Sequence, residues 1–406
     1  MRVLVLNPGS SSLKSSVVET ASIPEAAANG LYPAASAASL APLGEFGVDW
    51  GVDATADGDP ADDILALLRK YATAGIAPAS LAAVGYRVVH GGTALRQPVR
   101  VTPEVIAQVT ALTDLAPLHN GIAAATMTAG LAAIPRLPHV AVFDTAFHAT
   151  LPEEAYRYPV PERWYSEWGI RRYGFHGISV AWSAERAAAL LARPVGELRT
   201  VVAHLGSGCS VTAVDGGRSV ATSMGLTPLE GLMMGTRAGS IDPGILFYLL
   251  RTERLTADEL AEELDHWSGL AGVSGRTSDV RELMRMKANG DERATLALDL
   301  FARRAAECVA AAATALPALD AIVFTGGIGE NAAGLRARIV ARLGSVGVAP
   351  IAEESVTEDA VLAPAAQPAR LVQVETPGSS PAVLHIVARE DLVVAREAAR
   401  IVGDRS

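Results

Sequence analysis

Two segments rich in glycine and serine each follow an apolar stretch, and both contain residues suited to holding a phosphate group. The first apolar stretch leads to Asn7 and a turn at Gly9. The second leads to His204 and a turn at Gly206. Small residues let backbone N–H groups and hydroxyls approach an anion closely. Ordinary hairpin turns contain the same residues, so it is their duplication that predicts two related domains facing one polyphosphate.

Ionisable side chains gather at predicted strand ends and at glycine-rich turns. They are Arg87, His119, Asp144, His176, His204, Arg237 and Glu390. A buried histidine can simply be a hydrogen-bonded core residue, and an arginine such as Arg237 can brace a carboxylate. The functional alternative is a guanidinium aimed at phosphate, because its planar fork matches that geometry. Arginines, a histidine and a magnesium-holding carboxylate beside phosphate-binding turns favour phosphoryl transfer, which depends on positioning and positive charge.

Composition narrows the class of protein. The chain has 406 residues, of which 50% are hydrophobic and 19% charged, and its formal net charge is −10. Without a basic stripe, such an acidic chain is not expected to bind nucleic acid. Its two cysteines form neither a disulfide framework nor a metal cluster. We expect a cytoplasmic protein without a membrane span, since the alanine-rich stretch 309–319 contains Pro317 and reads as a buried helix.

Hydrophobic periodicity and turn residues predict alternating helices and strands. Helices are expected over 62–71, 103–115, 256–316 and 392–402, and strands over 84–89, 140–143, 201–205, 321–324 and 382–387. A glycine turn at 325–329 is expected to lead into a helix that begins at Glu330. A long loop is expected over 222–244, and irregular strands and loops over 22–60. This pattern predicts an α/β fold with two sheet-based domains and mixed strand directions.

The phosphate-binding turns do not match two common nucleotide motifs. The chain has no Gly-Lys-Ser/Thr of a Walker P-loop, and no G-x-G-x-x-G follows a predicted strand. Eight other stretches, in order along almost the whole chain, resemble the acetate kinase family, within the superfamily of acetate and sugar kinases, heat-shock ATPases and actin. They are NPGSSSLK, YRVVHGG, LAPLHN, VAVFDTAFH, RRYGFHG, HLGSG, TSMGLTPLEGLMMGTRAG and TGGIGEN.

The resemblance implies two ribonuclease-H-like (actin-like ATPase) domains, with mixed sheets flanked by helices and an active site in the interdomain cleft. The N-terminal domain would span 1–150 plus 388–406, closed by the C-terminal helix. Residues 151–387 would form a C-terminal domain for nucleotide binding and dimerisation. The implied reaction is reversible in-line transfer of the ATP γ-phosphoryl group to acetate, giving acetyl phosphate and ADP. Alternatives are a propionate kinase of the same family or a non-metabolic actin-like nucleotide-binding protein.

The resemblance also implies roles for individual residues. The matched catalytic positions are Arg87, Asp144, His176 and Arg237, with His119 as a neighbour. The matched acyl-binding positions are Arg87, Val89, Leu118, Phe175 and Pro228. Those matched to contact with Mg²⁺ (or Mn²⁺) are Asn7 and Glu390. Those matched to ATP or ADP are Ser10, Ser12, Lys14, His204, Leu205, Gly206, Ser207, Gly208, Asp279, Val280, Arg281, Gly326, Gly327, Ile328, Gly329, Glu330 and Asn331.

Three positions depart from the family pattern. Ser207 stands where asparagine is usual, Ser240 where an acidic residue is usual, and Gly121 where proline is usual. The first two lie in the predicted phosphate turn and beside Arg237, so they bear on nucleotide binding. The resemblance further implies that the protein works as a homodimer. Its implied small-molecule partners are ATP and acetate or another short carboxylate.

Overall fold

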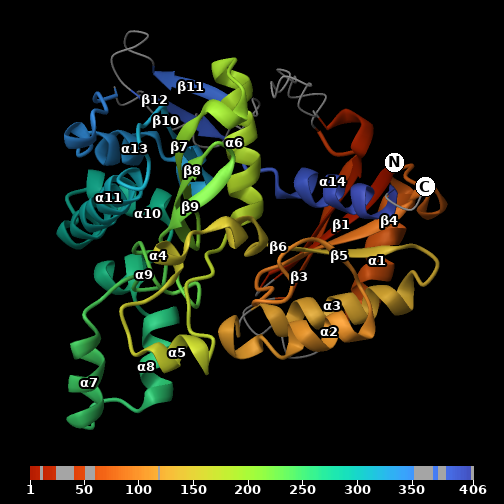
Figure 1. Ribbon diagram of the computed structural model, residues 1–406, viewed down its shortest axis with the longest axis horizontal. Helices are drawn as coiled ribbons and strands as arrows, with labels where there is room; N and C mark the ends of the chain where they lie inside the picture. The colour runs from red at the N-terminus through yellow and green to blue at the C-terminus, as the bar shows by residue number, and fades with distance from the viewer. Residues whose placement is uncertain are drawn as a thin grey trace. The chain divides into compact units, whose positions relative to one another are not determined.

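The computed structural model describes residues 1–9, 12–23, 41–50, 60–117, 119–351, 369–373 and 381–403. The chain divides into two compact units, coloured along the sequence in Figure 1. Unit 1 consists of Met1–Ala149, Phe175–Trp182 and Arg389–Ser406, and unit 2 of Thr150–Gly174 and Ser183–Ala388. The domain roles expected from the sequence remain predictions.

Unit 1 is built on a six-stranded mixed sheet with the order β3-β2-β1-β4-β6-β5. Strands β1, β2 and β3 form an antiparallel meander, whereas β1, β4 and β6 run parallel. The short β5 pairs antiparallel with β6 at the edge. The bounds are β1 Arg2–Pro8, β2 Ser12–Glu19, β3 Gly44–Asp49, β4 Ala83–Val88, β5 Val99–Arg100 and β6 His139–Phe143.

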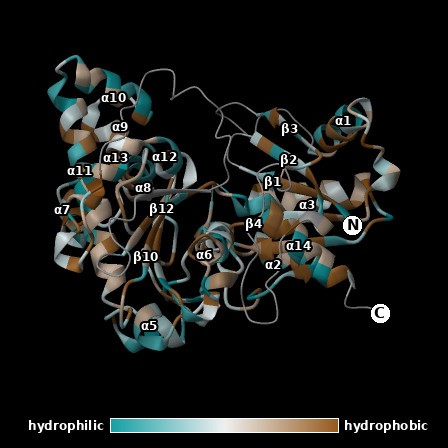
Figure 2. Cartoon of the chain, turned by 90° about the horizontal axis from the view of Figure 1, so that it is seen from above, coloured by the Kyte–Doolittle hydropathy of each residue, from teal (hydrophilic) through white to brown (hydrophobic). Residues whose placement is uncertain are grey.

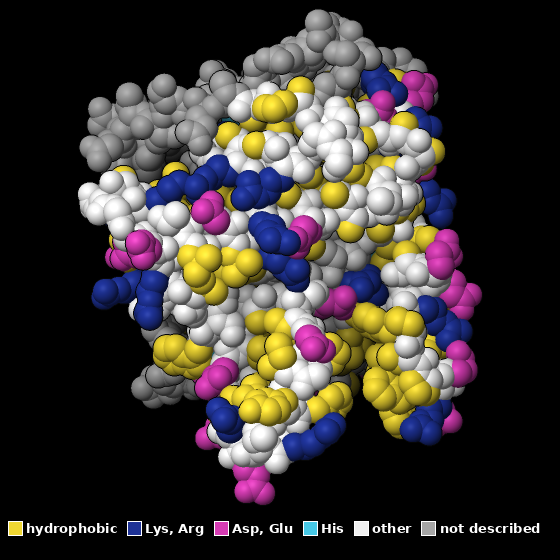
Figure 3. Space-filling model, turned by 90° about the vertical axis from the view of Figure 1, so that its left-hand side faces the viewer, with side chains coloured by type: hydrophobic (Ala, Val, Ile, Leu, Met, Phe, Trp, Pro, Cys, Tyr) yellow, Lys and Arg dark blue, Asp and Glu magenta, His cyan; other side chains and the backbone are white. Residues whose placement is uncertain are grey.

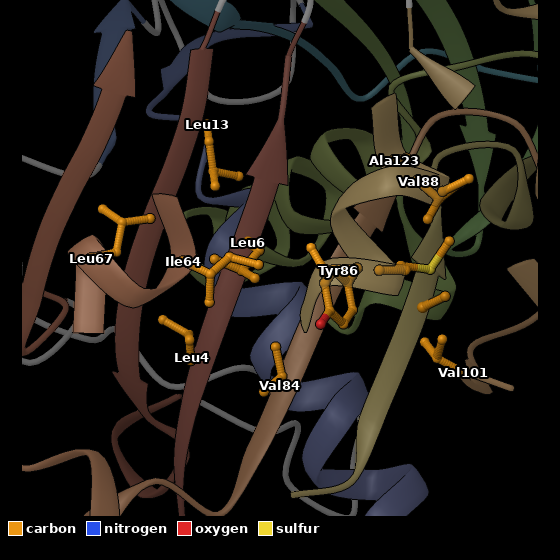
Figure 4. Close-up of a cluster of buried hydrophobic side chains, with 14 of the residues drawn as sticks. Leu4, Leu6, Leu13, Ile64, Leu67, Val84, Tyr86, Val88, Val101 and Ala123 are labelled. Carbon is orange, nitrogen blue, oxygen red and sulfur yellow. The ribbon is translucent and has the colours of Figure 1, made fainter. Parts of the chain in front are cut away.

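Helices cover both faces of this sheet. Helix α14 (Glu390–Gly403) packs on one face, and α1 (Pro60–Thr73), α2 (Pro103–Thr110) and α3 (Asn120–Ala133) lie on the other. Apolar residues of β1 are fully buried, and Figure 4 shows Ile64 and Leu67 of α1 beside Leu4 and Leu6. Gly85 allows close helix packing, since an added Cβ would lie 2.7 Å from Val394 of α14.

Unit 2 repeats this sheet plan. Its six strands are ordered β11-β12-β10-β7-β8-β9, with an antiparallel meander β7-β8-β9 and parallel strands β7, β10 and β12. All five residues of β10 are buried, and β10 is largely brown, hence hydrophobic, in Figure 2. The bounds are β7 Arg199–Leu205, β8 Cys209–Asp215, β9 Arg218–Thr222, β10 Ala321–Thr325, β11 Ala369–Gln373 and β12 Ala382–Ile386.

Ten helices, α4 to α13, lie between positions 153 and 340 of the chain, and the longest, α11, packs against β7 and β8. Their bounds are α4 Glu153–Tyr156, α5 Glu162–Ser166, α6 Gly177–Leu191, α7 Pro243–Arg251, α8 Ala257–His266, α9 Gly269–Ser274, α10 Val280–Ala288, α11 Glu292–Ala313, α12 Gly326–Asn331 and α13 Ala333–Val340. Short 3₁₀ turns occupy Thr20–Ser22, Pro78–Ser80, Thr113–Leu115, Ala146–Thr150, Val195–Glu197 and Gly344–Val346. Within the described residues, no helix combines the length and apolarity needed to cross a membrane.

The predicted α/β fold with two mixed sheets is confirmed, and so are both hairpins. Two helix boundaries were wrong. The helix expected over 103–115 ends at Thr110, and the chain continues as a 3₁₀ turn before Pro117, which disfavours helix in the residue that precedes it. The helix expected from Glu330 begins at Gly326, because a φ of +77° there turns the chain directly out of β10.

Two other expectations differ in detail. The helical region expected over 256–316 consists of four helices, α8 to α11, and one break falls at Gly275, whose φ is +65°. Much of the stretch 22–60 lies outside the described residues, and its described part includes β3. Helix α7 was not predicted because its apolar residues follow the glycine-rich loop without the polar face that marks an amphipathic helix.

Candidate active site

Four polar side chains meet at one edge of the unit 1 sheet. Arg87 lies on β4, Asn7 on β1, Asp144 directly after β6, and Glu390 at the first position of α14. The guanidinium of Arg87 donates to Asp144 from Nη2 (2.7 Å) and Nε (3.2 Å). Its Nη1 donates to Oδ1 of Asn7 at 3.3 Å, and its Nε lies 3.2 Å from Oε2 of Glu390. Parallel strands end at a common edge, so residues far apart in sequence are gathered here.

This group, the Arg87 cluster (Asn7, Arg87, Asp144 and Glu390), is largely shielded from water. Asp144 is 1% exposed and Arg87 is 18% exposed. Burial opposes the charge on Arg87, but the nearby carboxylates of Asp144 and Glu390 outweigh it and raise its pKa. Two carboxylates and one guanidinium give these three groups one net negative charge, which favours an added cation.

His176 is held in an unusual backbone conformation near this cluster in unit 1. Its φ is +57°, a left-handed value that costs free energy in a residue other than glycine. Hydrogen bonds fix the peptide groups on both sides of it. His148 donates from Nε2 to the carbonyl of Phe175 at 2.9 Å, and the N–H of Gly177 donates to the carbonyl of Asp144 at 3.0 Å. The backbone of His176 is thereby tied to the segment that carries Asp144.

Two of the predicted acyl-binding residues lie in the interior of unit 1. Phe175 is 1% exposed, and its ring meets the ring of His90 edge-on at 5.4 Å between centroids. Val89, next to His90, is 8% exposed. His119 precedes α3, at whose first residue Asn120 exchanges hydrogen bonds with the backbone of His90. Two predicted residues, Ser10 and Leu118, lie outside the described residues.

The predicted nucleotide residues of unit 1 lie on its first hairpin. Ser12 begins β2, and Lys14 pairs with Asn7 in the hairpin register. The side chain of Lys14 is exposed, whereas Leu13 is fully buried. The hairpin therefore directs an ammonium group into solvent close to the strand that carries Asn7.

Three glycine-rich segments come together in unit 2. An added Cβ at Gly326 would lie 3.1 Å from Nε2 of His204, and one at Gly206 would lie 4.0 Å from the backbone nitrogen of Gly327. The N–H of Gly235 donates to the carbonyl of Ser207 at 3.3 Å. The second hairpin, the start of α12 and the loop with Arg237 are thus neighbours. Their small residues leave backbone groups accessible to an anion.

Arg237 is held by its own loop. Its Nη1 donates to the carbonyl of Pro228 at 2.9 Å, and burial lowers its pKa despite the opposing influence of Asp265. The adjacent Thr236 donates from Oγ1 to the carbonyl of Asp265 at 2.8 Å. An arginine is charged even when its pKa is lowered in this way, so this loop keeps a half-buried cation.

The remaining predicted nucleotide residues occupy helix starts and a helix end. Asp279 caps the first turn of α10, and its hydrogen bond with Arg281 lowers the pKa of its carboxyl to about 2. Ser278, beside it, would contact an added Cβ at Gly235 at 3.4 Å. In α12, Asn331 donates to the carbonyl of Gly327 at 2.8 Å, and Glu330 accepts from the N–H of Ala388 at 2.8 Å. Val280 begins α10, Ile328 and Gly329 lie in α12, and Leu205 and Gly208 lie in the second hairpin.

The three departures from the family pattern take different places. Gly121 lies in the first turn of α3, where an added Cβ would find its nearest neighbour, Thr113, at 3.8 Å. Ser207 is exposed on its turn. Ser240 accepts from the N–H of Gly231 through its hydroxyl at 3.1 Å and donates its own N–H to the carbonyl of Gly231 at 2.9 Å. It thus closes the loop that carries Arg237.

The described residues of the two units contain no preformed cluster of metal ligands. Within the described residues, no group of three or more His, Cys, Asp or Glu side chains could hold a metal ion. The Arg87 cluster nevertheless offers oxygen donors alone, from Asn7, Asp144 and Glu390. Oxygen is the ligand type that Mg²⁺ prefers.

Sequence reasoning missed supporting residues that the structure makes evident. The carboxylate of Glu230 accepts from Tyr158 and Arg172 beside the loop that carries Arg237. The signal available in the sequence was the pair Arg171-Arg172, two cations in a row before a glycine turn. Glu230 lies 58 positions from Arg172 and 72 positions from Tyr158 along the chain, so spacing alone could not find this grouping.

Comparison with known proteins gives one consistent result. The sequence pattern of the Acetokinase family matches residues 2–396. A protein named acetate kinase from Deinococcus radiodurans is 48% identical over 410 residues, covering 100% of this chain and 99% of its own. One of the same name from Gloeobacter violaceus is 42% identical, covering 98% of each chain.

Solved structures agree with the sequence comparison. The Porphyromonas gingivalis acetate kinase superimposes with a TM-score of 0.81 at 32% identity, covering 99% of both chains. A propionate kinase from Francisella tularensis also gives a TM-score of 0.81 at 33% identity, covering 98% of this chain and 99% of its own.

Proposed function

The chain belongs to the acetokinase family, whose kinases transfer phosphate to acetate, and we propose a division of this reaction between its two units. Unit 1 supplies most of the groups that bind and align the carboxylate and the phosphoryl group in transfer, and unit 2 adds Arg237 and Pro228 to them. Unit 2 binds the nucleotide. Together they carry out the reversible reaction of ATP with acetate that yields acetyl phosphate and ADP.

The observation that carries this proposal is the Arg87 cluster. Acetate is already ionised at neutral pH, so its attack on phosphorus needs no general base. It needs alignment and neutralisation of the negative charges that approach one another. Arg87, oriented by Asp144 at 2.7 Å, supplies a fixed cation with little freedom to reorient. We assign His176 and Arg237 to the same task of stabilising the charge that develops during transfer.

The glycine-rich segments of unit 2 support nucleotide binding. The turn at Gly206 and the start of α12 at Gly326 lie side by side and carry no large side chains. We propose that their backbone N–H groups hold phosphate oxygens, while the segments that begin at Asp279 and end at Asn331 contact the adenosine. Ser10, Ser12 and Lys14 of the first hairpin complete the phosphate contacts in this proposal.

Mg²⁺, or Mn²⁺ in its place, fits the donors that the Arg87 cluster provides. Asn7 and Glu390 would hold it, since both present oxygens and the three charged groups are net negative. The cation would offset the charge of the phosphates when bound.

Acetate is favoured over propionate because the relatives of highest identity reported above carry that name. Val89, Phe175 and Pro228 are proposed as the apolar contacts of the methyl group. One additional methylene changes the free energy of binding in such a pocket by only about 1–3 kcal/mol. Propionate is therefore expected as a poorer substrate rather than as an excluded one.

The test is to trap the acyl phosphate with hydroxylamine. Purified protein receives ATP, Mg²⁺ and either acetate, propionate or butyrate, and hydroxamate formation is followed over time. We expect hydroxamate with acetate at the highest kcat/KM. No hydroxamate with any acid would overturn the proposed function, whereas a higher kcat/KM for propionate would change only the preferred substrate.

We propose in addition that the enzyme works as a homodimer through unit 2. All residues of α7 are described, and none is buried, although most are apolar. Ile245, Phe247 and Tyr248 are 45%, 56% and 57% exposed. Figure 3 shows hydrophobic side chains grouped on the lower part of the surface that it displays. Such a helix on the surface of a monomer exposes apolar area that a second copy would cover.

Light scattering tests the dimer. We expect a mass of two chains for the wild type and of one chain for Phe247→Glu, because a carboxylate in an apolar interface is costly to bury. The control is Leu65→Glu, which alters an exposed apolar residue of α1 in unit 1. A monomeric wild type, or a dimeric Phe247→Glu variant, would contradict this assignment.

A cytoplasmic location completes the proposal. Its support is chemical: the reaction consumes ATP, and Cys209 and Cys308 are both free thiols. Burial raises the pKa of the Cys209 thiol to about 12. Fractionation of the source cells should recover the activity with the cytoplasmic enzymes, and recovery with the membrane fraction would contradict it.

A further inference from the structure

We infer that Tyr158, Arg172 and Glu230, here named the loop clamp, are positioning residues that set the guanidinium of Arg237 and the ring of Pro228. The inference rests on the proposed function, in which Arg237 contacts the phosphoryl group and Pro228 contacts the acyl group. All three clamp residues belong to unit 2, as does the loop that they hold.

The clamp closes a short stretch of the loop at both ends. Arg172 donates from Nη1 to the carbonyls of Ser223 (2.9 Å) and Met224 (3.0 Å). Its Nη2 donates to Oε1 of Glu230 at 2.6 Å. One guanidinium therefore ties the beginning of the loop to a residue six positions beyond Met224.

Tyr158 adds a second cross-link over the same stretch. Its hydroxyl donates to Oε2 of Glu230 at 2.5 Å and accepts from the N–H of Leu226 at 3.0 Å. Burial raises the pKa of Tyr158, so the phenol stays protonated and can donate at neutral pH. The guanidinium of Arg172 lies 5.2 Å from the centroid of its ring. Each oxygen of the Glu230 carboxylate thus has its own donor.

The packing leaves little room for another arrangement. An added Cβ at Gly225 would overlap the Glu230 carboxylate and the Tyr158 hydroxyl. The carbonyl of Gly225 also accepts from the N–H of Tyr173 at 3.0 Å, next in sequence to Arg172. Gly225 therefore packs directly against the loop clamp and is also hydrogen-bonded to the segment that carries Arg172.

Pro228 lies inside the stretch that the clamp encloses, between Leu226 and Glu230. Its carbonyl accepts the hydrogen bond from Nη1 of Arg237 at 2.9 Å. The backbone of Arg237 is fixed separately, since its carbonyl accepts from the N–H of Met234 at 3.1 Å. The loop clamp thus positions the Pro228 carbonyl, which is the hydrogen-bond partner of the Arg237 guanidinium, and does not hold the Arg237 backbone.

Two consequences follow for the reaction. Loosening the clamp would let the Pro228 carbonyl move and misplace the Arg237 guanidinium, which lowers kcat, since small displacements of aligned groups are costly. It would also free the Pro228 ring, so the preference for acetate over propionate would weaken. Nucleotide affinity, which depends on the glycine-rich segments, would stay the same.

The experiment compares four proteins in the hydroxamate assay: wild type, Glu230→Gln, Arg237→Ala and the double variant. Glu230→Gln keeps the shape of the side chain and removes its charge. We expect a loss of about tenfold in kcat for acetate with an unchanged KM for ATP. The ratio of kcat/KM for acetate over propionate should fall about threefold.

The double variant separates positioning from general structure. If the clamp acts through Arg237, Glu230→Gln has no further effect on kcat once Arg237 is alanine. Equal losses in both backgrounds, or an unchanged acyl preference, would overturn the inference while leaving the proposed function intact. Absence of hydroxamate from the wild type would instead overturn the proposed function.

Two further variants make the result specific. Tyr158→Phe removes only a hydroxyl and should reproduce the shift in acyl preference, which keeps the test open if Glu230→Gln folds poorly. Glu162→Gln is the matched control, because it removes a carboxylate paired with Arg157 on the exposed α5 segment. It should leave kcat and acyl preference unchanged, and a shift equal to that of Glu230→Gln would count against the clamp.

Discussion

The two units use one sheet plan and place different chemistry on it. In each, an antiparallel hairpin is followed by two parallel strands and an antiparallel edge strand. Asn7 of β1 lies beside Arg87 of β4, and His204 of β7 pairs in register with Thr325 of β10. Where unit 1 has a charged arginine on its second parallel strand, unit 2 has a buried threonine followed by two glycines.

This difference shows that the same sheet plan can carry different kinds of residue at its strand ends. Strand ends at one sheet edge can present side chains, as Arg87 and Asp144 do, or small residues that expose the backbone, as Gly326 and Gly327 do. The hairpins differ likewise: β1 and β2 last pair at Pro8 and Leu13, whereas β7 and β8 last pair at Leu205 and Cys209. The second turn is shorter and is followed by a buried thiol.

The largest effect is expected from removing the guanidinium of Arg87, which contacts Asn7, Asp144 and Glu390 at the edge of the unit 1 sheet. Arg87→Ala should lower kcat at least about 10²-fold, in line with the loss of a fixed donor at a transition state. It also leaves Asp144, 1% exposed, without its ion pair, so the free energy of unfolding should drop by about 3 kcal/mol. Steady-state kinetics and urea unfolding measure the two effects. Retention of half the wild-type kcat would remove Arg87 from the reaction.

At the unit 2 edge, replacing either of two adjacent glycines by alanine should affect stability to different extents. Gly326 has a φ of +77°, and an added Cβ would lie 2.7 Å from the carbonyl oxygen of Leu205, so Gly326→Ala should cost about 2 kcal/mol or more of stability. Among the described residues, apart from its chain neighbours and the backbone of its own helix, none comes within 4 Å of a Cβ added at Gly327, so Gly327→Ala should unfold like the wild type. Thermal unfolding compares them, and equal melting temperatures for the two variants would refute the close approach at Gly326.

A pH-dependent effect is expected in unit 1, at His148, which donates a hydrogen bond to the carbonyl of Phe175 next to His176. Burial lowers the pKa of His148 to about 4, against an ordinary 6.5. Between these values the unfolded chain binds the proton and the folded chain does not, so stability is present above pH 6.5 and is lost as the pH falls toward 4. Each proton that only the unfolded chain binds changes the free energy of unfolding by about 1.4 kcal/mol per pH unit.

Urea unfolding at several pH values between 4.5 and 7 measures that slope. His148→Gln retains an amide donor for the Phe175 carbonyl and does not titrate, so its slope should be shallower than that of the wild type. If both proteins lose stability in parallel, His148 is not the group that titrates.

The smallest effect concerns the exposed serine of the second hairpin. Ser207→Asn restores the residue usual in the family and adds one amide near the proposed phosphates. A single new hydrogen bond is worth about 0.5–1.5 kcal/mol, so the affinity for ADP should rise a few-fold. Calorimetric titration measures this change. The control is Gly344→Ala, a substitution in open space outside the site that should leave the affinity unaltered. A decrease with Ser207→Asn would mean that the turn does not face the nucleotide.

Local patterns were sufficient to predict much of this molecule. Alternating apolar strands and turn glycines predicted both hairpins, and Asp144 was placed correctly at the end of a buried strand. The meeting of Asn7, Arg87 and Glu390 could not follow from spacing, because Glu390 comes from the far end of the chain and reaches the site through α14 packing on β4. The family resemblance, not periodicity, supplied that grouping.

Other features depend on tertiary contacts that leave no local trace. The left-handed backbone of His176 is maintained by hydrogen bonds from His148 and to Asp144. The loop clamp joins Tyr158 and Arg172 to Glu230, and only the folded loop brings these residues together. Helix α7 is apolar on a surface, which contradicts the pattern that sequence reasoning uses to recognise helices in monomers.

The division of labour between the two sheet edges can be tested in one calorimetric comparison. ADP is titrated into the wild type, into Asp144→Asn and into Gly327→Ala, each shown to be folded. We expect Asp144→Asn to bind ADP within about threefold of the wild type although its kcat falls about 10²-fold, and Gly327→Ala to bind ADP about tenfold more weakly. Equal loss of ADP affinity in both variants, or loss only in Asp144→Asn, would contradict it.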